Sequence, residues 1–377
     1  MDKQKVLLRE NEERLISSRE ELQNILDFRK ENDYWKDADA NMVTVVGLPP
    51  IMDENNPERD VTLTSEEKSD ILACVNKLGV WTSDLTKESL YIAYPIRDVA
   101  LKDVCARAGV FGPRLTNIED KPFEAALPSA IKAKILNYGL ACNSRRCQLL
   151  VRDEAVVAMK SDKYVIFNIW EIIPNVEKAL REVFPELEYV DGSIGDDGIY
   201  CNYYFNATIE EANVAMRLTT NGEEYTVKSG VLFKTSDTGS SAVCVRPFFE
   251  LNGRKLPLGE RKAMEHREGV SAEKYFESLK EVASSLQEMS DTIEEMANLD
   301  IEFPKNCLLN LCKDSQLPAK VAETKILPDD CTALDIYIVL TEIVEEEYTD
   351  TNDYLLNLEK VSKLRNIQLF KNADKED

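Results

Sequence analysis

The sequence feature that most constrains the fold is a pair of apolar, strand-like runs late in the middle of the chain. The runs YTVKSGVLFKTS and SAVCVRPFFEL are joined across DTGS, whose residue types favour tight turns. This order predicts a β-hairpin with antiparallel pairing between residues 228–235 and 242–250. One face of the second strand is marked by Val243, Val245, Phe249 and Leu251. Arg246 lies on the other face only if a bulge near Pro247 resets the alternation.

Segments of both secondary-structure types surround the hairpin. CQLLVRDEAVVAMKS has two apolar runs separated by three charged residues, the pattern of two strands and a tight turn. PNVEKALREVF predicts a helix, begun either by a capping box of Asn168 and Glu171 or by Pro174 as its first residue. GIYCNYYFNA predicts a further strand. We therefore expect an α+β fold with a central, mostly antiparallel sheet, flanked by helical N- and C-terminal regions, and a central α/β core over 148–270.

The N-terminal segment, residues 1–40, is predicted to hold one long helix over 3–31. Leu8, Leu15 and Leu22 recur there every seven residues, but only one of the three companion seam positions is apolar. The helix therefore either docks on its own chain or forms a weak coiled coil that makes a homo-oligomer.

Residues 41–147 are predicted to form a small, mostly helical region that begins with the exposed loop GLPPIMDENNPER. Thr64 or Ser65 would cap a helix that ends near Gly79. ESLYIAYPI predicts a short strand, and RDVALKDVCARAGV predicts a helix closed by Gly109. PSAIKAKILNYGLA predicts another helix.

The C-terminal region, residues 271–377, is predicted to be helical. Apolar residues at three- and four-residue steps indicate a helix over 272–297 that packs on the core. Two shorter helices are expected at 304–313 and 317–325. CTALDIYIVLTEIVEEEY is apolar on most sides before its glutamates, so its first turns should be buried.

Composition narrows the classes of function. The chain has 377 residues, a net charge of −23 and a pI near 4.6, so its field would repel nucleic acid except at a local basic groove. It has no apolar run near the roughly 18 residues that cross a bilayer, and we expect no membrane contact. Its nine cysteines suit reduced thiols, and a zinc site is disfavoured because there is one histidine and Cys307 and Cys312 diverge on a helix.

The run KSDKY follows an apolar strand directly and carries more charge than a turn requires. If this strand end lies beside the SDTG hairpin loop, the two would form one polar cleft. The cleft would be lined by Arg152, Lys160, Asp162, Tyr164, Ser236, Asp237, Thr238 and Arg246. Asp162 and Asp237 would then hold a divalent cation, while the basic side chains position phosphate. The alternative is that Asp162 caps a turn and never meets the hairpin loop.

The segment NGRKLPLGERKAMEHR is an exception in an acidic chain, since five cations and two carboxylates give it a net charge of +3. Such cations follow the backbone of single-stranded nucleic acid, and nearby aromatic rings stack on bases. The predicted phosphate contacts are Arg254, Lys255, Arg261, Lys262 and Arg267, joined by Arg246. The predicted stacking residues are Tyr203, Tyr204, Phe248 and Phe249. The alternative is a solvated loop paired with acidic neighbours.

Four short motifs follow one another between residues 90 and 348. LLVRDEAVVAMKSDKYVIFN has an arginine-bearing strand and a Ser-Asp-aromatic stretch, and FKTSDTGSSAVCVRPFFELNG has a hairpin loop followed by Asn-Gly. MEHREG and then CTALDIYIVLTEIVEEE complete the series. In this order they resemble the phage- and plasmid-encoded family catalogued as domain of unknown function 932. The chain departs from that family at Glu268, which is an insertion between Arg267 and Gly269.

The resemblance implies a mobile-element protein, often encoded beside replication and recombination genes, located in the cytoplasm of the host cell. It implies no catalytic residue.

Three functions stay open at this point. The leading one is binding of single-stranded nucleic acid in mobile-element DNA metabolism without a covalent step. The second is a metal-dependent enzyme acting on phosphate esters at Asp162 and Asp237. The third is an acidic partner-binding or assembly protein, suggested by the acidic run over 342–353. A histidine-based catalytic arrangement has no support, because His266 is the only imidazole and no nucleophile is adjacent.

Overall fold

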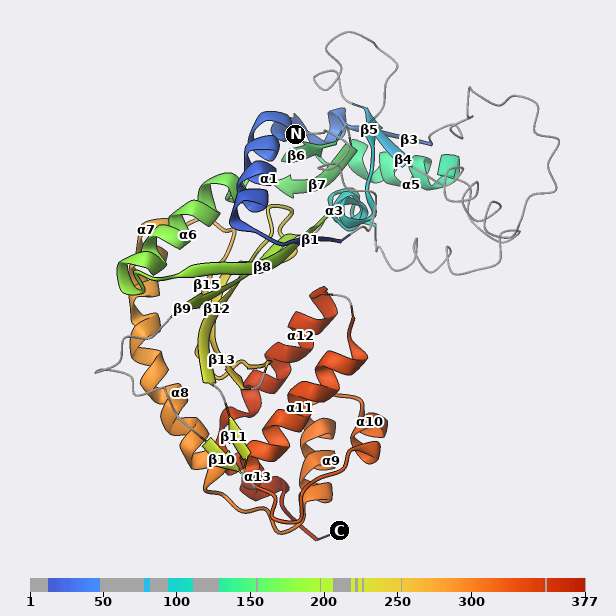
Figure 1. Cartoon of the computed structure of the whole chain (residues 1–377). Coiled ribbons are helices and arrows are strands. Elements are labelled where there is room, and N and C mark those ends of the chain that lie inside the picture. Colours follow the sequence, from blue (N-terminus) through green and yellow to red (C-terminus); the bar gives the residue numbers. More distant parts are fainter. Residues whose placement is uncertain are drawn as a thin grey trace, which may run out of the picture.

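The protein is described by a computed structural model in which an N-terminal unit, a central sheet and a C-terminal group of helices follow one another (Figure 1). The sheet lies between the other two parts. This arrangement confirms the predicted α+β fold with helical regions on both sides of a mostly antiparallel sheet. The described residues are 13–47, 78–81, 94–110, 129–153, 155–196, 198–205, 218–220, 223–225, 227–251, 253–349 and 351–376.

The central sheet contains seven described strands, and every pair of neighbours is antiparallel. Six strands follow the order β1-β8-β9-β12-β13-β14, and β15 also pairs with β13. Their bounds are β1 Arg14–Ile16, β8 Glu188–Gly195, β9 Gly198–Phe205, β12 Val227–Thr235, β13 Val243–Leu251, β14 Arg254–Leu256 and β15 Lys262–Met264.

The predicted hairpin is confirmed as β12 and β13, which pair in an unbroken register that ends with Lys234 opposite Cys244. The bulge considered near Pro247 does not occur. The carbonyl oxygen of Pro247 accepts the amide of Gly259 at 3.3 Å, on the side where β14 and β15 leave a gap between them. Since the nitrogen of a strand residue faces the same side as its carbonyl, the missing N–H of proline falls in that gap and no ladder bond is lost.

Alternation along β13 separates two buried faces. The apolar residues Val243, Val245 and Phe249 belong to the main core, where the sheet packs against helices. The remaining face carries Cys244, Arg246, Phe248 and Glu250, and every residue of β13 is buried. Because Arg246 contacts Ser362 of the C-terminal helices, this second face is covered by the C-terminal region.

Three helices run along one side of the sheet in Figure 1: α6 (Ile169–Val183), α7 (Ala272–Ser278) and α8 (Val282–Ala297). Helix α6 begins after Asn168, and Pro174 lies inside it rather than at its first position. The Asn168 side chain makes no capping bond, so the expected capping box is absent. The helix predicted over 272–297 is confirmed, except that the short 3₁₀ turn Leu279–Glu281 separates α7 from α8.

The N-terminal unit has more strand than the predicted mostly helical region. It contains one three-stranded sheet of β2 (Tyr34–Asp39), β6 (Arg146–Arg152) and β7 (Ala155–Ser161). A second sheet consists of β3 (Thr44–Gly47), β4 (Leu78–Trp81) and β5 (Tyr94–Pro95). Helices α3 (Asp98–Ala108) and α5 (Ser129–Ala141) and the 3₁₀ turn Ala40–Met42 complete the unit. The β6–β7 pair and both helices were predicted. The helix expected to end near Gly79 is wrong at that end, because Gly79 lies in strand β4 and pairs with Val46, and the rest of it lies outside the described residues.

The prediction of one long N-terminal helix is wrong in its first described part. Arg14–Ile16 is a strand, and helix α1 (Arg19–Asn32) starts only after Ser18, whose side chain accepts the amide of Glu21 at 3.1 Å. Leu22 is buried against the chain's own core, which is the predicted docking in cis, while Leu15 is 75% exposed on the strand. These two leucines therefore do not share a coiled-coil seam, and residue 8 lies outside the described part.

The C-terminal region is helical, as predicted. Helix α11 is buried along most of its length and begins with a capping box between Thr332 and Asp335. The described elements beyond α8 are α9 (Pro304–Ser315), α10 (Ala319–Thr324), α11 (Ala333–Glu347), α12 (Thr351–Ser362), the 3₁₀ turn Lys363–Arg365 and α13 (Ile367–Ala373). A separate two-stranded ribbon is formed by β10 (Leu218–Thr220) and β11 (Glu223–Tyr225).

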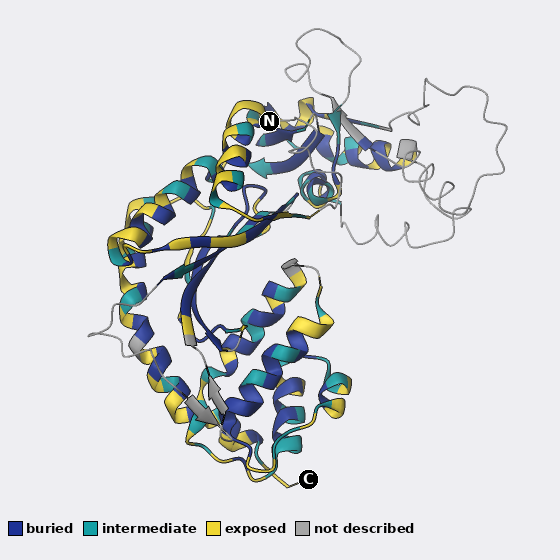
Figure 2. Cartoon of the chain, in the orientation of Figure 1, coloured by how far each residue is buried: buried dark blue, intermediate teal, exposed yellow. Residues whose placement is uncertain are grey.

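Burial is concentrated where the sheet meets its helices and among the C-terminal helices (Figure 2). A smaller core lies inside the N-terminal unit. The eight cysteines in the described part of the chain are all free thiols, as their scattered positions predicted. No described helix combines the length and apolarity needed to cross a membrane.

Candidate functional site

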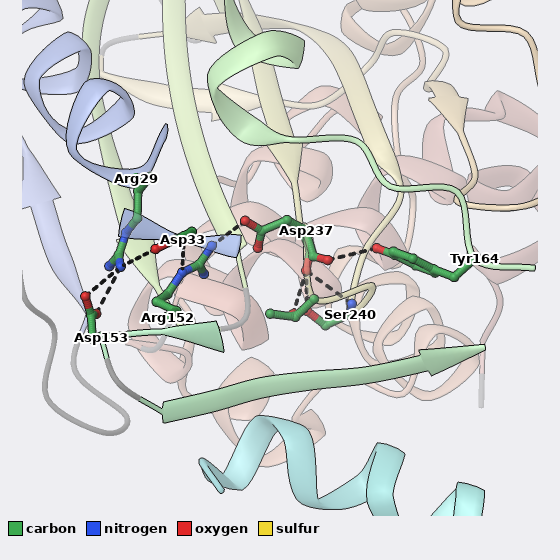
Figure 3. A network of polar contacts seen from close by, with 9 residues as sticks. Arg29, Asp33, Arg152, Asp153, Tyr164, Asp237 and Ser240 are labelled. Carbon is green, nitrogen blue, oxygen red and sulfur yellow. Dashed lines mark hydrogen bonds and ion pairs between the residues drawn. The ribbon is translucent and has the colours of Figure 1, made fainter. Parts of the chain in front are cut away.

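Arg152 and Asp237, two of the residues predicted to line a polar cleft, belong to a closed ionic network between the N-terminal unit and the sheet (Figure 3). Arg152 of β6 lies between two carboxylates: its Nε is 2.7 Å from Asp33, and its guanidinium also pairs with Asp237. Arg29 of α1 extends the network, at 3.3 Å from Asp33 and 3.0 Å from Asp153. All of these side chains are almost fully buried, so they form part of the interior and not an open cleft.

The network continues to the edge of the sheet. Arg97, just before α3, lies 3.6 Å from Asp153 and also pairs with Asp196 in the turn after β8. Burial raises the pKa of Asp33 above its usual range, although Arg152 and Arg29 oppose the shift. Burial alone would lower the pKa of Arg152, but its carboxylate neighbours hold it above the ordinary value. Alternating cations and carboxylates therefore join the two parts of the molecule.

The loop between β12 and β13 is fastened to this network. The Tyr164 hydroxyl donates to the backbone oxygen of Asp237 at 3.0 Å. The Ser236 hydroxyl is 2.9 Å from those of Thr238 and Ser240, and it accepts the Ser240 amide at 3.2 Å. These bonds fix the loop both from inside and against the strand end that carries Tyr164.

Gly239 allows the loop to pack tightly. Its φ of +75° lies in the region that favours glycine, and an added Cβ would be 2.9 Å from the Tyr164 ring and 3.0 Å from Lys160. Lys160 in turn lies 2.7 Å from Asp103 of α3 and 5.9 Å from the centre of the Tyr164 ring. The two strand ends meet here, through packing of the loop on Lys160 and Tyr164, which the sequence had left open.

His266 packs on the other side of the Tyr164 ring. The two rings are stacked with centroids 4.9 Å apart, and His266 Nδ1 is 3.0 Å from the backbone oxygen of Val165. Its Nε2 is buried, and the backbone of Ser241 lies beside the same histidine as a second polar neighbour. Burial lowers the pKa of His266, which favours the neutral imidazole at neutral pH.

The two aspartates proposed to hold a metal lie in different environments. Asp162 is exposed in the turn that follows β7, whereas Asp237 is buried and ion-paired with Arg152. Among residues 13–376, as far as they are described, no group of three or more His, Cys, Asp and Glu side chains could hold a metal ion. A cation at Asp237 would have to displace a buried guanidinium, so the geometry gives the metal site no support.

The cations of the predicted basic loop have acidic or aromatic partners. Arg254 lies 3.2 Å from Glu345 and 3.6 Å from Glu342, both on α11. The Lys255 ammonium is 5.6 Å from the centre of the Phe248 ring, and burial lowers the pKa of this lysine. The first half of the loop is therefore turned toward the C-terminal helices.

The second half of the loop shows the same pattern. Lys262 lies 2.8 Å from Glu281 and 3.1 Å from Glu260. Arg267 is exposed and lies 3.0 Å from Glu265. This is the pairing with acidic neighbours that the sequence left as an alternative, and phosphate binding by these residues stays a prediction.

The aromatic residues predicted to stack on bases are mostly inside the protein. Tyr203, Phe248 and Phe249 are each at most 1% exposed. Tyr204 is partly exposed, but its hydroxyl donates to Glu250 and its ring meets Phe248 edge-on. The concave aromatic platform that a base needs is therefore not formed by this set.

A pocket of about 320 Å³ lies on the far side of the hairpin loop, where β12 and β13 face α12. Three cations, Lys234, Arg246 and Arg261, line it together with one carboxylate, Glu359. Both arginines approach that carboxylate: Arg261 is 3.1 Å from it and Arg246 is 3.9 Å from it. The two arginines therefore outnumber the one carboxylate that they share.

The other partners of these arginines are weak acceptors. Arg261 Nε lies 3.0 Å from the Cys244 sulfur, and Arg246 donates to the Ser362 hydroxyl. Burial raises the pKa of Cys244, so this thiol stays neutral, and burial lowers the pKa of Arg246. The hydroxyl oxygen of Ser241, another lining residue, is buried and lacks a partner in the described structure. An anion would satisfy these donors better than a thiol and a hydroxyl do.

One wall of the pocket is apolar. Helix α12 contributes Leu356, which is 58% exposed and is the apolar side chain most open to solvent along this wall. The other apolar lining residues include Leu232, Leu355 and Leu358. The pocket therefore presents cationic and apolar surfaces together, which suits a ligand with a charged end and an uncharged body.

Sequence reasoning placed Arg246 and Arg261 among binding residues but missed the pocket itself. The hairpin register contained part of the answer. Lys234 lies opposite Cys244 and Leu232 lies opposite Arg246, so Lys234 and Arg246 are on the same face of the sheet. Glu359 and its helix come more than a hundred residues later, and nothing in the local pattern links them to the hairpin.

Comparisons of the chain with protein-family models, with curated proteins and with solved structures found no match. The interpretation of the site therefore depends on its geometry and charge. The likeness in motif order to domain of unknown function 932 remains an inference from the sequence.

Proposed function

We propose that the protein binds single-stranded nucleic acid without catalysing a covalent step, and that a phosphate enters the pocket beside α12. The observation that carries this proposal is that Arg246 and Arg261 share one carboxylate in a partly enclosed pocket. Buried charge is costly unless it is paired, so a site with surplus cations favours an anionic ligand. Mobile-element DNA metabolism, which the motif order suggests, is the setting we propose for this activity.

The charge of the rest of the protein restricts where a nucleic acid can bind. With a net charge of −23, most of the surface repels a polyanion, whereas the pocket lining is positive. The basic loop contributes Arg261 to this pocket, while Arg254 faces the glutamates of α11. We therefore assign phosphate contact to Arg246 and Arg261 in preference to the whole loop.

The test is equilibrium binding of labelled single- and double-stranded DNA and RNA across a salt series, with and without a divalent cation. We expect single strands to bind most tightly at low salt and to need no divalent cation. Arg261→Gln should weaken binding of unrelated sequences equally, because phosphate contacts carry no base information. Each lost contact should also flatten the log–log salt dependence by roughly 0.7 for a single strand.

Arg254→Gln is the matched control, since it removes the same charge from the same loop but outside the pocket. It should leave affinity and salt slope unchanged. Loss of binding in Arg254→Gln with full binding in Arg261→Gln would move the site to the exposed part of the loop. If the parent protein fails to bind any nucleic acid at low salt, the proposed function is rejected.

A further inference from the structure

One wall of the pocket carries an apolar side chain that the protein leaves more than half uncovered. Leu356 of α12 lines the pocket beside Arg246 and Arg261 and is 58% exposed, whereas Leu355 and Leu358 are buried. Single exposed leucines are common on protein surfaces and carry no meaning by themselves. This leucine is informative because it shares a partly enclosed pocket with two arginines that have one carboxylate between them.

Helix α12 fixes how far this apolar contact lies from the charged one. Leu356 comes three residues before Glu359, the carboxylate that Arg246 and Arg261 share. Residues three apart are neighbours on the same helix face, with Cβ atoms about 5–6 Å apart. A phosphate held by the arginines beside Glu359 therefore has Leu356 within one helical turn. Because only the sugar separates a base from its phosphate, one nucleotide can reach both points together.

The size of the pocket limits what can occupy it. At about 320 Å³ it lies at the lower end of ligand pockets, which span about 300–1,000 Å³. Since a water molecule takes about 30 Å³ in the liquid, this volume is equivalent to roughly ten waters. It has room for a phosphate and part of one nucleoside but not for a base pair.

The apolar wall also distinguishes an unpaired base from a paired one. In a duplex the flat faces of the bases are covered by stacking, so a protein meets phosphates, sugars and base edges. In a single strand the bases can be splayed out and their faces placed against side chains. Apolar side chains make such contacts where bases leave the stack.

We propose that Leu356 is the residue by which this site selects single-stranded over double-stranded nucleic acid, through apolar contact with one unpaired base. The inference rests on the proposed function and adds a specificity-determining residue to it. Arg246 and Arg261 bind the phosphate, and Leu356 contacts the base that follows. This contact is independent of sequence, because every base has a flat face. No bond is made or broken.

The experiment compares three DNA ligands at one salt concentration: a labelled single strand, the same strand with abasic sites in place of its bases, and its duplex. The abasic strand keeps every phosphate, so it separates base contact from phosphate contact. We expect the base-bearing single strand to bind roughly fivefold or more tightly than either of the others, which corresponds to about 1 kcal/mol.

Leu356→Ala removes the apolar contact and places the strongest helix former at an exposed position, so the fold should be retained. Its affinity for the base-bearing strand should fall to that for the abasic strand. The log–log salt slope should stay unchanged because no ionic contact is lost, whereas Arg261→Gln should flatten it by roughly 0.7. Ile326→Ala is the matched control, since Ile326 is 95% exposed and lies outside the pocket lining. It should alter neither affinity nor slope.

Equal affinity of the parent protein for base-bearing and abasic strands would overturn this inference and leave the proposed function standing. An undiminished preference for the base-bearing strand in Leu356→Ala would overturn it as well, because the base would then contact another residue. Failure of all three ligands to bind at low salt would overturn both the inference and the proposed function.

Discussion

The two sides of the β12–β13 loop use the same kinds of charged residue in different proportions. On one side, Arg152 is enclosed by the carboxylates of Asp33 and Asp237. On the other side, Arg246 and Arg261 share the single carboxylate of Glu359. The first arrangement is closed, and each of its cations is matched by two carboxylates, whereas the second is open to a pocket and has two cations that share one carboxylate.

This difference separates a structural role from a binding role. A matched buried pair avoids the cost of an isolated buried charge but offers nothing to a ligand. Surplus cations beside a pocket leave a favourable interaction for an anion to complete. Residue type alone would have assigned both sides to one site, so it is the ratio of charges, together with access, that distinguishes them.

The largest loss of stability is expected when the buried ionic network around Arg152, the matched side of the loop, loses its central cation. Arg152→Ala would leave Asp33 and Asp237 buried without their shared cation, and it should lower the free energy of unfolding by about 3–5 kcal/mol. Urea denaturation followed by circular dichroism measures this change. Arg254→Ala, which removes a half-exposed surface ion pair, should cost only about 0–1 kcal/mol. Similar losses of stability in both variants would show that the buried network stabilises the fold no more than a surface ion pair does.

A smaller effect is expected from the loop that the two sides share. Gly239→Ala should destabilise the protein by about 1–3 kcal/mol, because the residue has a positive φ and its Cβ would press on the Tyr164 ring. Gly253→Ala is the matched control, since its φ is +85° but an added Cβ meets nothing within 4 Å. Thermal unfolding of the two variants separates packing from backbone strain. Equal shifts in melting temperature would contradict tight packing of the loop.

Removing a cation from the unmatched side should act on binding more than on stability. Arg261→Gln is expected to reduce affinity for single-stranded nucleic acid roughly tenfold, about 1.4 kcal/mol, while stability changes by less than about 1 kcal/mol because Glu359 is partly exposed and keeps Arg246 nearby. Parallel titrations and urea curves on the same preparation test this. A large loss of stability without loss of affinity would place Arg261 with the matched side.

The smallest effect is expected from His266, which touches the loop from the matched side. Burial lowers the pKa of His266, so its contribution to stability is complete above the unfolded value of about 6.5 and is lost as the pH falls through that value toward the folded one. Lys160 opposes the charged imidazolium and Asp237 favours it. The free energy of unfolding should therefore decline as the pH is lowered from about 7.5 to 5.5. His266→Gln should flatten this decline. An identical slope in the variant would exclude His266 as the cause of the pH dependence.

The hairpin, the β6–β7 pair and most helices could be predicted because their patterns are local. Apolar alternation around DTGS defined β12 and β13, and the stripe from Tyr275 to Met296 defined the helices beside the core. The strand at Arg14–Ile16 was missed because heptad leucines run through it, and only its pairing with β8 selects the extended form. Local periodicity was overridden there by tertiary contact.

The candidate site was harder to predict, since its meaning depends on partners distant in sequence. The sequence offered contact between KSDKY and SDTG as one of two alternatives, and the network also needs Arg29 and Asp33 of the N-terminal segment. The pairing of Arg246 and Arg261 with one carboxylate depends on α12, which no local motif connects to the hairpin. Charge counts from sequence therefore identified basic residues but not which of them lack full neutralisation.

The central claim is that the charge surplus around Glu359 creates the binding site, and Glu359→Gln tests it most directly. Replacing this carboxylate removes the group that competes with a phosphate for both arginines. Two unit charges 4 Å apart interact by about 1 kcal/mol even in bulk water, so affinity for single-stranded nucleic acid should rise by about fivefold or more. Titration calorimetry of parent and variant measures the change. Unchanged or weaker binding by a folded Glu359→Gln protein would contradict the account.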